Sequence, residues 1–219
     1  VPLFIDAWKV DLAYSCSQKG LSCPPGLGPF TMSVRAEEKL AKRSSQVPNW
    51  YLDVSLVNKY WGSDRVYHHT APVSMLYGIN EALRIVMEEG LETRFERHRI
   101  NAEALNAGLQ AIGLNAVAPQ GSRLEQITPV WIPDGVDDME VRNMLLNEFS
   151  IELGRGLGDF SGKVWRVGLM GESSKQEYVL TFLSAIESIL SRVGYEVAQG
   201  AAVAEATKIY NTYPGKKKS

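Results

Sequence analysis

Apolar residues recur at two different spacings along the chain, and the change of spacing separates helices from strands. From Pro72 they recur every three or four residues for about 40 residues, which is the period of an amphipathic helix. Gly90 and Leu91 are expected to bend this long helix, and Gly113 is expected to cap its end. Beyond Gly113, short apolar runs predict strands over 114–118, 126–132 and 163–169, and longer periodic runs predict helices over 136–149 and 174–193.

The first 75 residues contain shorter apolar runs. Those over 1–5, 12–16 and 29–34 predict short buried strands, and periodic runs over 35–43 and 53–60 predict short helices. Segment 1–5 lacks the basic start and the small-residue cleavage site of a signal peptide, so we interpret it as a strand. A chain that opens inside a core strand leads us to expect that a further segment of the protein precedes it.

This order of elements predicts an α/β protein with several parts. We expect a first part over 1–75, a connecting helix over 76–110 and a small α+β domain over 111–195. The alanine-rich segment 196–219 is predicted to be a flexible tail that is at most weakly helical.

Composition narrows the class of protein. The chain has 219 residues, 45% of them hydrophobic, which is typical of a folded soluble protein. Its formal net charge of −2 gives no reason to expect a nucleic-acid or membrane partner. Two cysteines without a secretion signal indicate free thiols in a reducing compartment. The end of the chain, Lys217-Lys218-Ser219, does not match the peroxisomal S-K-L address, so we expect a cytoplasmic protein.

Lys19 is the first candidate for chemistry. It follows an apolar strand and precedes a loop rich in glycine and proline, in the run Ser17-Gln18-Lys19-Gly20. Burial at the end of the strand would favour a neutral, nucleophilic amine that can form a Schiff base. The alternative, taken from position alone, is an ordinary exposed loop lysine.

A second cluster is the run Tyr67-His68-His69-Thr70 ahead of Pro72. Adjacent side chains in an extended loop point in opposite directions, and no cysteine or carboxylate stands at metal-ligand spacing around the histidines. We therefore do not expect a metal site here. The hydroxyls of Tyr67 and Thr70 are candidate donors to an anion.

Arg166 lies within a predicted strand, Lys163-Val164-Trp165-Arg166-Val167-Gly168-Leu169. An arginine in a strand needs an anionic partner or access to water, so a bidentate bond to a carboxylate and an edge-strand arginine in water are both open. The nearby run Gly154-Arg155-Gly156-Leu157-Gly158 has the wrong spacing for a dinucleotide loop, and a flexible turn is predicted.

Three runs together resemble the class V pyridoxal-phosphate-dependent aminotransferases, in particular their alanine–glyoxylate, serine–glyoxylate and serine–pyruvate branch. They occur in the family's order, and the resemblance extends to about Val193. Related cysteine desulfurases have a His-Lys pair where this chain has Gln18-Lys19. The runs are Ser17-Gln18-Lys19 with Pro24-Pro25-Gly26, Tyr67-His68-His69-Thr70-Ala71-Pro72, and Gly162-Lys163-Val164-Trp165-Arg166-Val167-Gly168-Leu169-Met170-Gly171.

The resemblance implies the C-terminal part of the pyridoxal-phosphate-dependent transferase fold, in which residues 1–75 would be the end of the large, mixed-sheet, cofactor-binding domain. It also implies a role for each candidate residue. Lys19 would form the Schiff base with pyridoxal 5'-phosphate and would move the proton of the substrate carbon. Gln18 would help to hold the cofactor phosphate. Tyr67 and Thr70 would reach a phosphate bound mainly by the neighbouring subunit, which implies a homodimer with shared sites. Arg166 would hold the α-carboxylate of a small amino acid or 2-oxo acid.

Two departures from the family pattern matter. The family's aspartate for the pyridine nitrogen, its stacking aromatic residue and its glycine-rich phosphate loop would precede this sequence, and Asp6 and Asp11 stand too close to Lys19 to replace that aspartate. We therefore expect a fragment, a cleaved product or one piece of a split chain with a separate N-terminal polypeptide. In addition, Arg155 stands where relatives commonly have a small residue.

Three functions are open at this point. The first is transamination between alanine or serine and glyoxylate or pyruvate. The second is another class V activity, such as kynurenine-type transamination or a lyase. The third is a catalytically inactive module for dimerisation or interaction.

Overall fold

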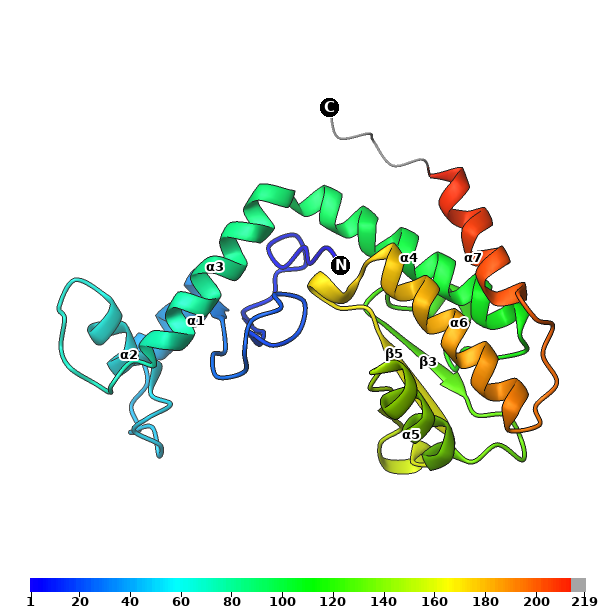
Figure 1. Ribbon diagram of the computed structural model, residues 1–219. Coiled ribbons are helices and arrows are strands. Elements are labelled where there is room, and N and C mark those ends of the chain that lie inside the picture. Colours follow the sequence, from blue (N-terminus) through cyan, green and yellow to red (C-terminus); the bar gives the residue numbers. More distant parts are fainter. Residues whose placement is uncertain (214–219) are drawn as a thin grey trace. The chain divides into compact units, whose positions relative to one another are not determined.

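The computed structural model describes residues 1–213 and divides into two units, one over Pro2–Arg84 and one beginning at Ile85 that also includes Val1. Figure 1 shows the helices and strands of both units. Among the described residues, no helix is long and apolar enough to cross a membrane. The run Lys216-Lys217-Lys218 and the final Lys217-Lys218-Ser219 lie outside the described residues.

The Pro2–Arg84 unit is built on a two-stranded antiparallel sheet. Strands β1 (Leu12–Tyr14) and β2 (Phe30–Met32) pair with Ala13 opposite Thr31. Helix α1 (Val34–Ala41) follows, and the Ser33 side chain caps it by accepting a hydrogen bond from the Ala36 amide. Helix α2 (Val54–Trp61) is capped in the same way by Asp53, and α3 (Val73–Glu89) begins after Pro72.

The strand predicted over 1–5 is wrong. These residues lead into a turn in which the Trp8 amide donates to the Phe4 carbonyl and the Val10 amide donates to the Ile5 carbonyl. A strand needs a neighbouring strand to satisfy its backbone groups, and the two-stranded sheet of this unit does not include these residues. Leu3 and Phe4 are accordingly 70% and 57% exposed, and not buried as we expected.

The second unit contains a three-stranded antiparallel sheet in the order β3-β5-β4. Its strands are β3 (Ile127–Trp131), β4 (Gly154–Arg155) and β5 (Val164–Gly168). Its helices are α4 (Leu91–Ala111), α5 (Asp138–Phe149), α6 (Gln176–Arg192) and α7 (Ala201–Thr212), with short 3-10 turns over Gln120–Ser122, Gly158–Phe160 and Gly171–Ser173.

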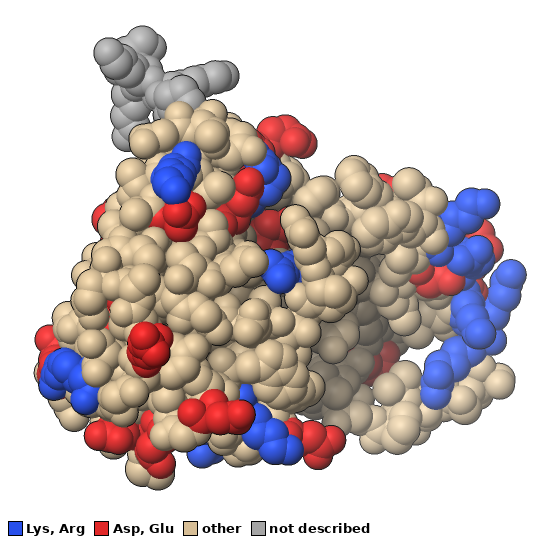
Figure 2. All heavy atoms as spheres, turned by 90° about the vertical axis from the view of Figure 1, so that its right-hand side faces the viewer, with Lys and Arg blue, Asp and Glu red and all other residues tan. Residues whose placement is uncertain are grey.

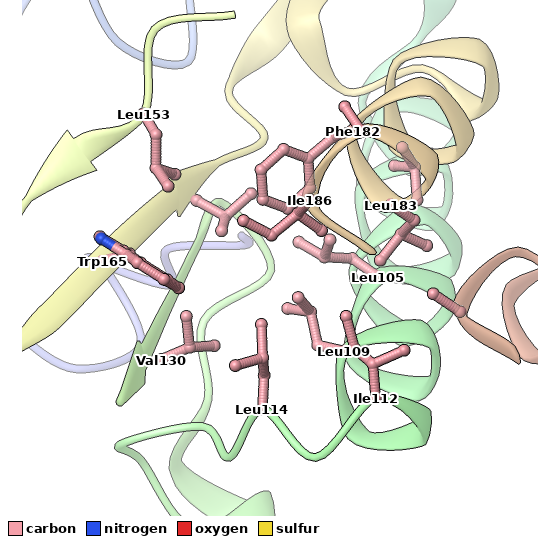
Figure 3. Packing of buried hydrophobic residues seen from close by; sticks show 14 of the residues in the cluster. Leu105, Leu109, Ile112, Leu114, Val130, Leu153, Trp165, Phe182, Leu183 and Ile186 are labelled. Carbon is pink, nitrogen blue, oxygen red and sulfur yellow. The ribbon is translucent and has the colours of Figure 1, made fainter. Parts of the chain in front are cut away.

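The core of this unit lies between the sheet and helices α4 and α6. Figure 3 shows Val130 and Trp165 of the sheet pointing toward Leu105 and Leu109 of α4 and Ile186 of α6. Each of these side chains is at most 2% exposed, and the full burial of one such aliphatic side chain contributes about 1.5–3 kcal/mol. The Trp165 ring also donates from Nε1 to Asp138 of α5 at 2.9 Å, which satisfies its only polar atom.

The flexible tail predicted from residue 196 is wrong over α7. Ala202 and Ala206 are fully buried, and α7 packs along α4. The buried carboxylate of Glu187 on α6 accepts hydrogen bonds from the Gly200 and Ala202 amides and so caps the start of α7. Small side chains allow this close approach, because the Gly108 backbone of α4 leaves no room for a Cβ beside the Ala202 carbonyl.

Two further expectations about this unit need correction. Segment 114–118 forms no strand and contributes only an isolated bridge between Ala116 and Val130. The turn predicted around Gly154-Arg155-Gly156 is an ordered edge strand instead, because β4 pairs with β5 and the Gly156 amide donates to the Val164 carbonyl at 2.7 Å.

Candidate functional site

Lys19 lies at the tip of a closed loop that follows β1. The base of the loop is the fully buried Ser17, whose hydroxyl donates to the Pro24 carbonyl at 2.7 Å, and the Ser17 amide donates to the Leu27 carbonyl at 3.1 Å. Lys19 itself is exposed, and not buried at the end of the strand as we expected. None of the ion pairs found among residues 1–213 involves Lys19, so a carbonyl compound can reach its amine.

No pattern in the sequence singled out Ser17, although its side chain holds the loop that carries Lys19 closed. The buried hydroxyl also accepts a longer hydrogen bond from the Leu27 amide at 3.4 Å. Gln18, between Ser17 and Lys19, is exposed, and its amide can donate to an anion. A buried serine inside a loop could have been suspected only from the proline and glycine that follow it.

The hydroxyl groups of Tyr67 and Thr70 come together in the loop before α3. Their oxygens are 3.1 Å apart, and both side chains are exposed. Two neighbouring hydroxyl donors at a surface can bind an oxyanion such as a phosphate. In the part of the chain that is described, no group of three or more His, Cys, Asp or Glu residues could hold a metal ion.

Arg166 stands on β5 and belongs to the second unit. Its Nε donates to the Arg155 carbonyl of β4 at 2.8 Å, and no carboxylate among the described residues forms an ion pair with it. The guanidinium borders a 260 Å³ pocket, whose other walls include Leu153 and the Tyr178 and Phe182 side chains of α6. With Nε engaged, the two Nη atoms form the edge that can bind a carboxylate.

The candidate residues therefore fall into two groups. The Pro2–Arg84 unit contains Gln18, Lys19, Tyr67 and Thr70, whereas Arg166 lies in the unit that begins at Ile85.

A buried polar network in the second unit was not predicted. Glu89 accepts from Arg94 and Arg97, and hydrogen bonding from Arg97 holds the pKa of the Glu89 carboxyl below its ordinary value. Arg97 also donates to the carbonyls of Gly171 and Ser174, so the network holds the turn that follows β5. Glu89 ends α3 whereas Arg94 and Arg97 lie on α4, five and eight residues later, so the helical spacing of charged pairs gave no signal for this network.

Charges on the surface are otherwise mixed. Figure 2 shows acidic and basic side chains interspersed over most of the face that it presents, with several basic side chains close together at its right-hand edge.

Comparisons with known proteins agree with these assignments at the level of the family. The profile of the family described as Aminotransferase class-V matches residues 1–162. The (S)-ureidoglycine–glyoxylate transaminase of Bacillus subtilis is 38% identical over 94% of this chain and 54% of its own length. The alanine–glyoxylate aminotransferase of Callithrix jacchus is 39% identical over 86% of this chain and 47% of its own length.

Solved structures show the same relationship. An alanine–glyoxylate aminotransferase from Nostoc sp. has a TM-score of 0.84 and 56% identity, covering 87% of this chain and 50% of that one. The ureidoglycine–glyoxylate aminotransferase of Bacillus subtilis has a TM-score of 0.91 and 40% identity, covering 94% of this chain and 54% of that one. The chain thus spans about half the length of these relatives, and its fold is that of the corresponding part of the pyridoxal-phosphate-dependent transferases.

Proposed function

Because this chain belongs to the class-V aminotransferase family, whose cofactor is pyridoxal 5'-phosphate, we propose that it supplies the cofactor-binding lysine and the carboxylate-binding arginine of a transaminase that uses glyoxylate. The amino donor in this proposal is alanine or serine, and pyruvate is the second acceptor. The observation that carries the proposal is the exposed, ion-pair-free Lys19 amine on a loop that the buried Ser17 holds closed.

The described residues fit this cofactor. An aldehyde requires an accessible amine, which Lys19 offers, and a phosphate requires hydrogen-bond donors. Gln18 offers one beside Lys19, and the Tyr67 and Thr70 hydroxyls offer two to the phosphate of a neighbouring subunit. When bound, the cofactor supplies an electron sink that makes a proton on the substrate α-carbon removable.

Each residue then has a defined task. Lys19 would hold the cofactor through its Nζ, and the same amine, once free, would move the proton of the substrate α-carbon. Arg166 binds the α-carboxylate through its Nη atoms, so the same group can orient both the amino donor and the keto acceptor. Tyr67 and Thr70 donate to the phosphate of a neighbouring subunit, which makes a homodimer with shared sites part of the proposal.

A second donor is favoured by a specific observation. The Bacillus subtilis relative named (S)-ureidoglycine–glyoxylate transaminase matches 94% of this chain, so (S)-ureidoglycine belongs in the panel of donors beside alanine and serine. Product analysis with this panel separates the two transaminations from kynurenine-type transamination and from a lyase reaction. The free thiols Cys16 and Cys23 support our proposal of a reducing compartment, the cytoplasm.

The test is the visible absorbance of the native protein, before and after borohydride reduction. We expect a visible band that reduction abolishes, with the cofactor mass then attached to the peptide that contains Lys19. Lys19→Ala should lack the band, whereas Lys9→Ala, which removes another exposed lysine of the same unit, should keep it. A band that persists in Lys19→Ala would refute the assignment, and a native protein without any band would favour the inactive interaction module.

A further inference from the structure

His68 is the one buried residue in the run from Tyr67 to Thr70. It is 4% exposed, whereas the adjacent Tyr67 is 71% exposed. Among the described residues, 67–71 form no backbone–backbone hydrogen bond; the nearest ones join the Val66 amide to the Lys59 carbonyl before the loop and the Met75 amide to the Pro72 carbonyl after it. Side chains must therefore hold the conformation of this loop.

The imidazole of His68 is bonded at both of its nitrogen atoms. Nε2 lies 3.1 Å from the Trp50 carbonyl, and Nδ1 lies 2.8 Å from Nδ1 of His69. A carbonyl oxygen can only accept, so His68 Nε2 carries a hydrogen. In the neutral ring Nδ1 then accepts, and His69 Nδ1 must be the donor. The geometry thus assigns opposite tautomers to the two neighbouring histidines.

Three aromatic side chains from the preceding segment pack around the two rings. Trp50 stacks on His68 with the ring centroids 4.2 Å apart, and Tyr51 meets the His69 ring edge-on at 5.3 Å. Tyr60 of α2 contacts both His69, at 5.2 Å, and Tyr67, at 6.1 Å. We call Trp50, Tyr51 and Tyr60 the aromatic platform.

The two members of the hydroxyl pair flank His68 along the chain. Tyr67 precedes it, Thr70 follows it by two residues, and their oxygens meet 3.1 Å apart. Tyr67, His68, His69 and Thr70 each contact another side chain, and the buried His68 ring is bonded to the Trp50 carbonyl, 18 residues earlier. Because the loop has no backbone–backbone hydrogen bonds, these side-chain contacts must keep the Tyr67 and Thr70 hydroxyls at hydrogen-bond distance.

We infer that His68 is a positioning residue, which locks the Tyr67 and Thr70 hydroxyls in the arrangement that receives a phosphate monoester. This inference rests on the proposed function, because it takes the two hydroxyls as phosphate donors. His68 touches neither phosphate nor substrate. Its contribution is to order the loop before the phosphate binds, so that the entropy cost of ordering is not subtracted from the binding free energy.

A buried histidine that serves only packing would leave the hydroxyl pair unaffected, and a double-mutant cycle separates the two cases. His68→Phe retains the stacking on Trp50 and removes both ring hydrogen bonds. In the native cofactor-loaded protein we expect cofactor affinity to fall roughly tenfold, the value of one ordered hydrogen bond to a charged group. In a background of Tyr67→Phe with Thr70→Val, the same change should cost nothing further.

The outcomes are distinct. An equal loss of affinity in both backgrounds would overturn the positioning role of His68. Unchanged affinity in the Tyr67→Phe, Thr70→Val background itself would refute the phosphate role in the proposed function. If His68→Phe does not fold, His69→Phe removes only the bond to His68 Nδ1 and should give a smaller loss with the same dependence on background.

A second readout does not depend on cofactor or activity. The chain has three histidines, so nitrogen-15 spectra of the imidazole rings can be assigned by single substitutions. We expect His68 to carry its hydrogen on Nε2 and His69 on Nδ1. Finding the hydrogen of His68 on Nδ1 would contradict the bond to Trp50 and overturn the inference.

Discussion

The Gly171 amide donates a 2.9 Å hydrogen bond to Nε2 of His98, 73 residues earlier in the chain. The opposite nitrogen, Nδ1, donates to the Arg94 carbonyl at 2.7 Å. Only a neutral imidazole with its hydrogen on Nδ1 can make both bonds, because a protonated ring has no acceptor. His98 is 5% exposed, and its ring therefore joins α4 to the turn after β5 in its uncharged form.

The stability of the protein should consequently depend on pH through His98. Burial, with a smaller effect of the nearby Arg97 and Arg94, lowers the pKa of His98 from its ordinary value of 6.5. Between the lowered and the ordinary pKa the unfolded chain binds more protons, so this contribution to stability is complete above about pH 6.5 and is lost as pH falls through the folded-state pKa. Urea unfolding between about pH 8 and pH 5 should show a falling free energy of unfolding.

The control for this prediction is His98→Gln, which keeps a donor and an acceptor but does not titrate. Its free energy of unfolding should vary less over the same range than that of the unchanged chain, although it is lower at pH 8 by about 1–2 kcal/mol. A variant curve parallel to the original would show that other groups cause the dependence. The carboxyl of Glu89, whose pKa hydrogen bonding from Arg97 lowers, affects stability only at more acidic pH.

A second prediction concerns the contact between α4 and α7. Gly→Ala inside a helix usually stabilises by about 0.5–1 kcal/mol, but a Cβ at Gly108 would lie 2.5 Å from Leu183 Cδ1 and 2.8 Å from the Ala202 carbonyl. Gly108→Ala should therefore lower the free energy of unfolding by about 1–3 kcal/mol, as overpacking does. Gly121→Ala, where a Cβ would meet nothing within 4 Å, is the control and should change it by less than about 0.5 kcal/mol.

The third prediction separates the side chain of Arg166 from that of Arg155 and rests on the proposed function. Arg166→Lys removes the planar fork, so the KM for both amino donor and keto acid should rise roughly 10- to 100-fold. Arg155→Ala keeps the backbone carbonyl that accepts from Arg166 Nε, and its KM values should stay within about threefold. Initial-rate kinetics of the native protein check both. A larger effect of Arg155→Ala would assign the carboxylate to the Arg155 side chain.

The spacing of apolar residues and the positions of capping glycines were sufficient to predict the helices and strands in the central part of the chain. The bend at Gly90 divides α3 from α4, and Gly113 ends α4 with a φ of 81°, as the sequence predicted. Helices α5 and α6 and strands β3 and β5 also lie within the predicted segments. In each case a local pattern and the tertiary packing favour the same structure.

The errors concern segments whose structure is decided by distant residues. Helix α7 has a weak local signal because its buried side chains are alanines, and its stability comes from α4 and from the carboxylate of Glu187. Strand β4 exists because β5 lies beside it, and nothing in Gly154-Arg155 indicates that pairing. For the candidate site, the residues that carry chemistry were identified from a family resemblance. Their anchors, Ser17 and His68, depend on contacts that periodicity does not encode.

The contact between Gly108 and Ala202 also constrains how the chain acquires its fold during synthesis. The two residues are separated by 94 positions, which a ribosome takes roughly 5–20 s to translate. Throughout that interval the face of α4 that α7 will cover is open to the surrounding solution. A nascent chain of this protein therefore presents a partly finished core for seconds, and in that interval chaperones and proteases can act on a surface that the finished molecule never displays.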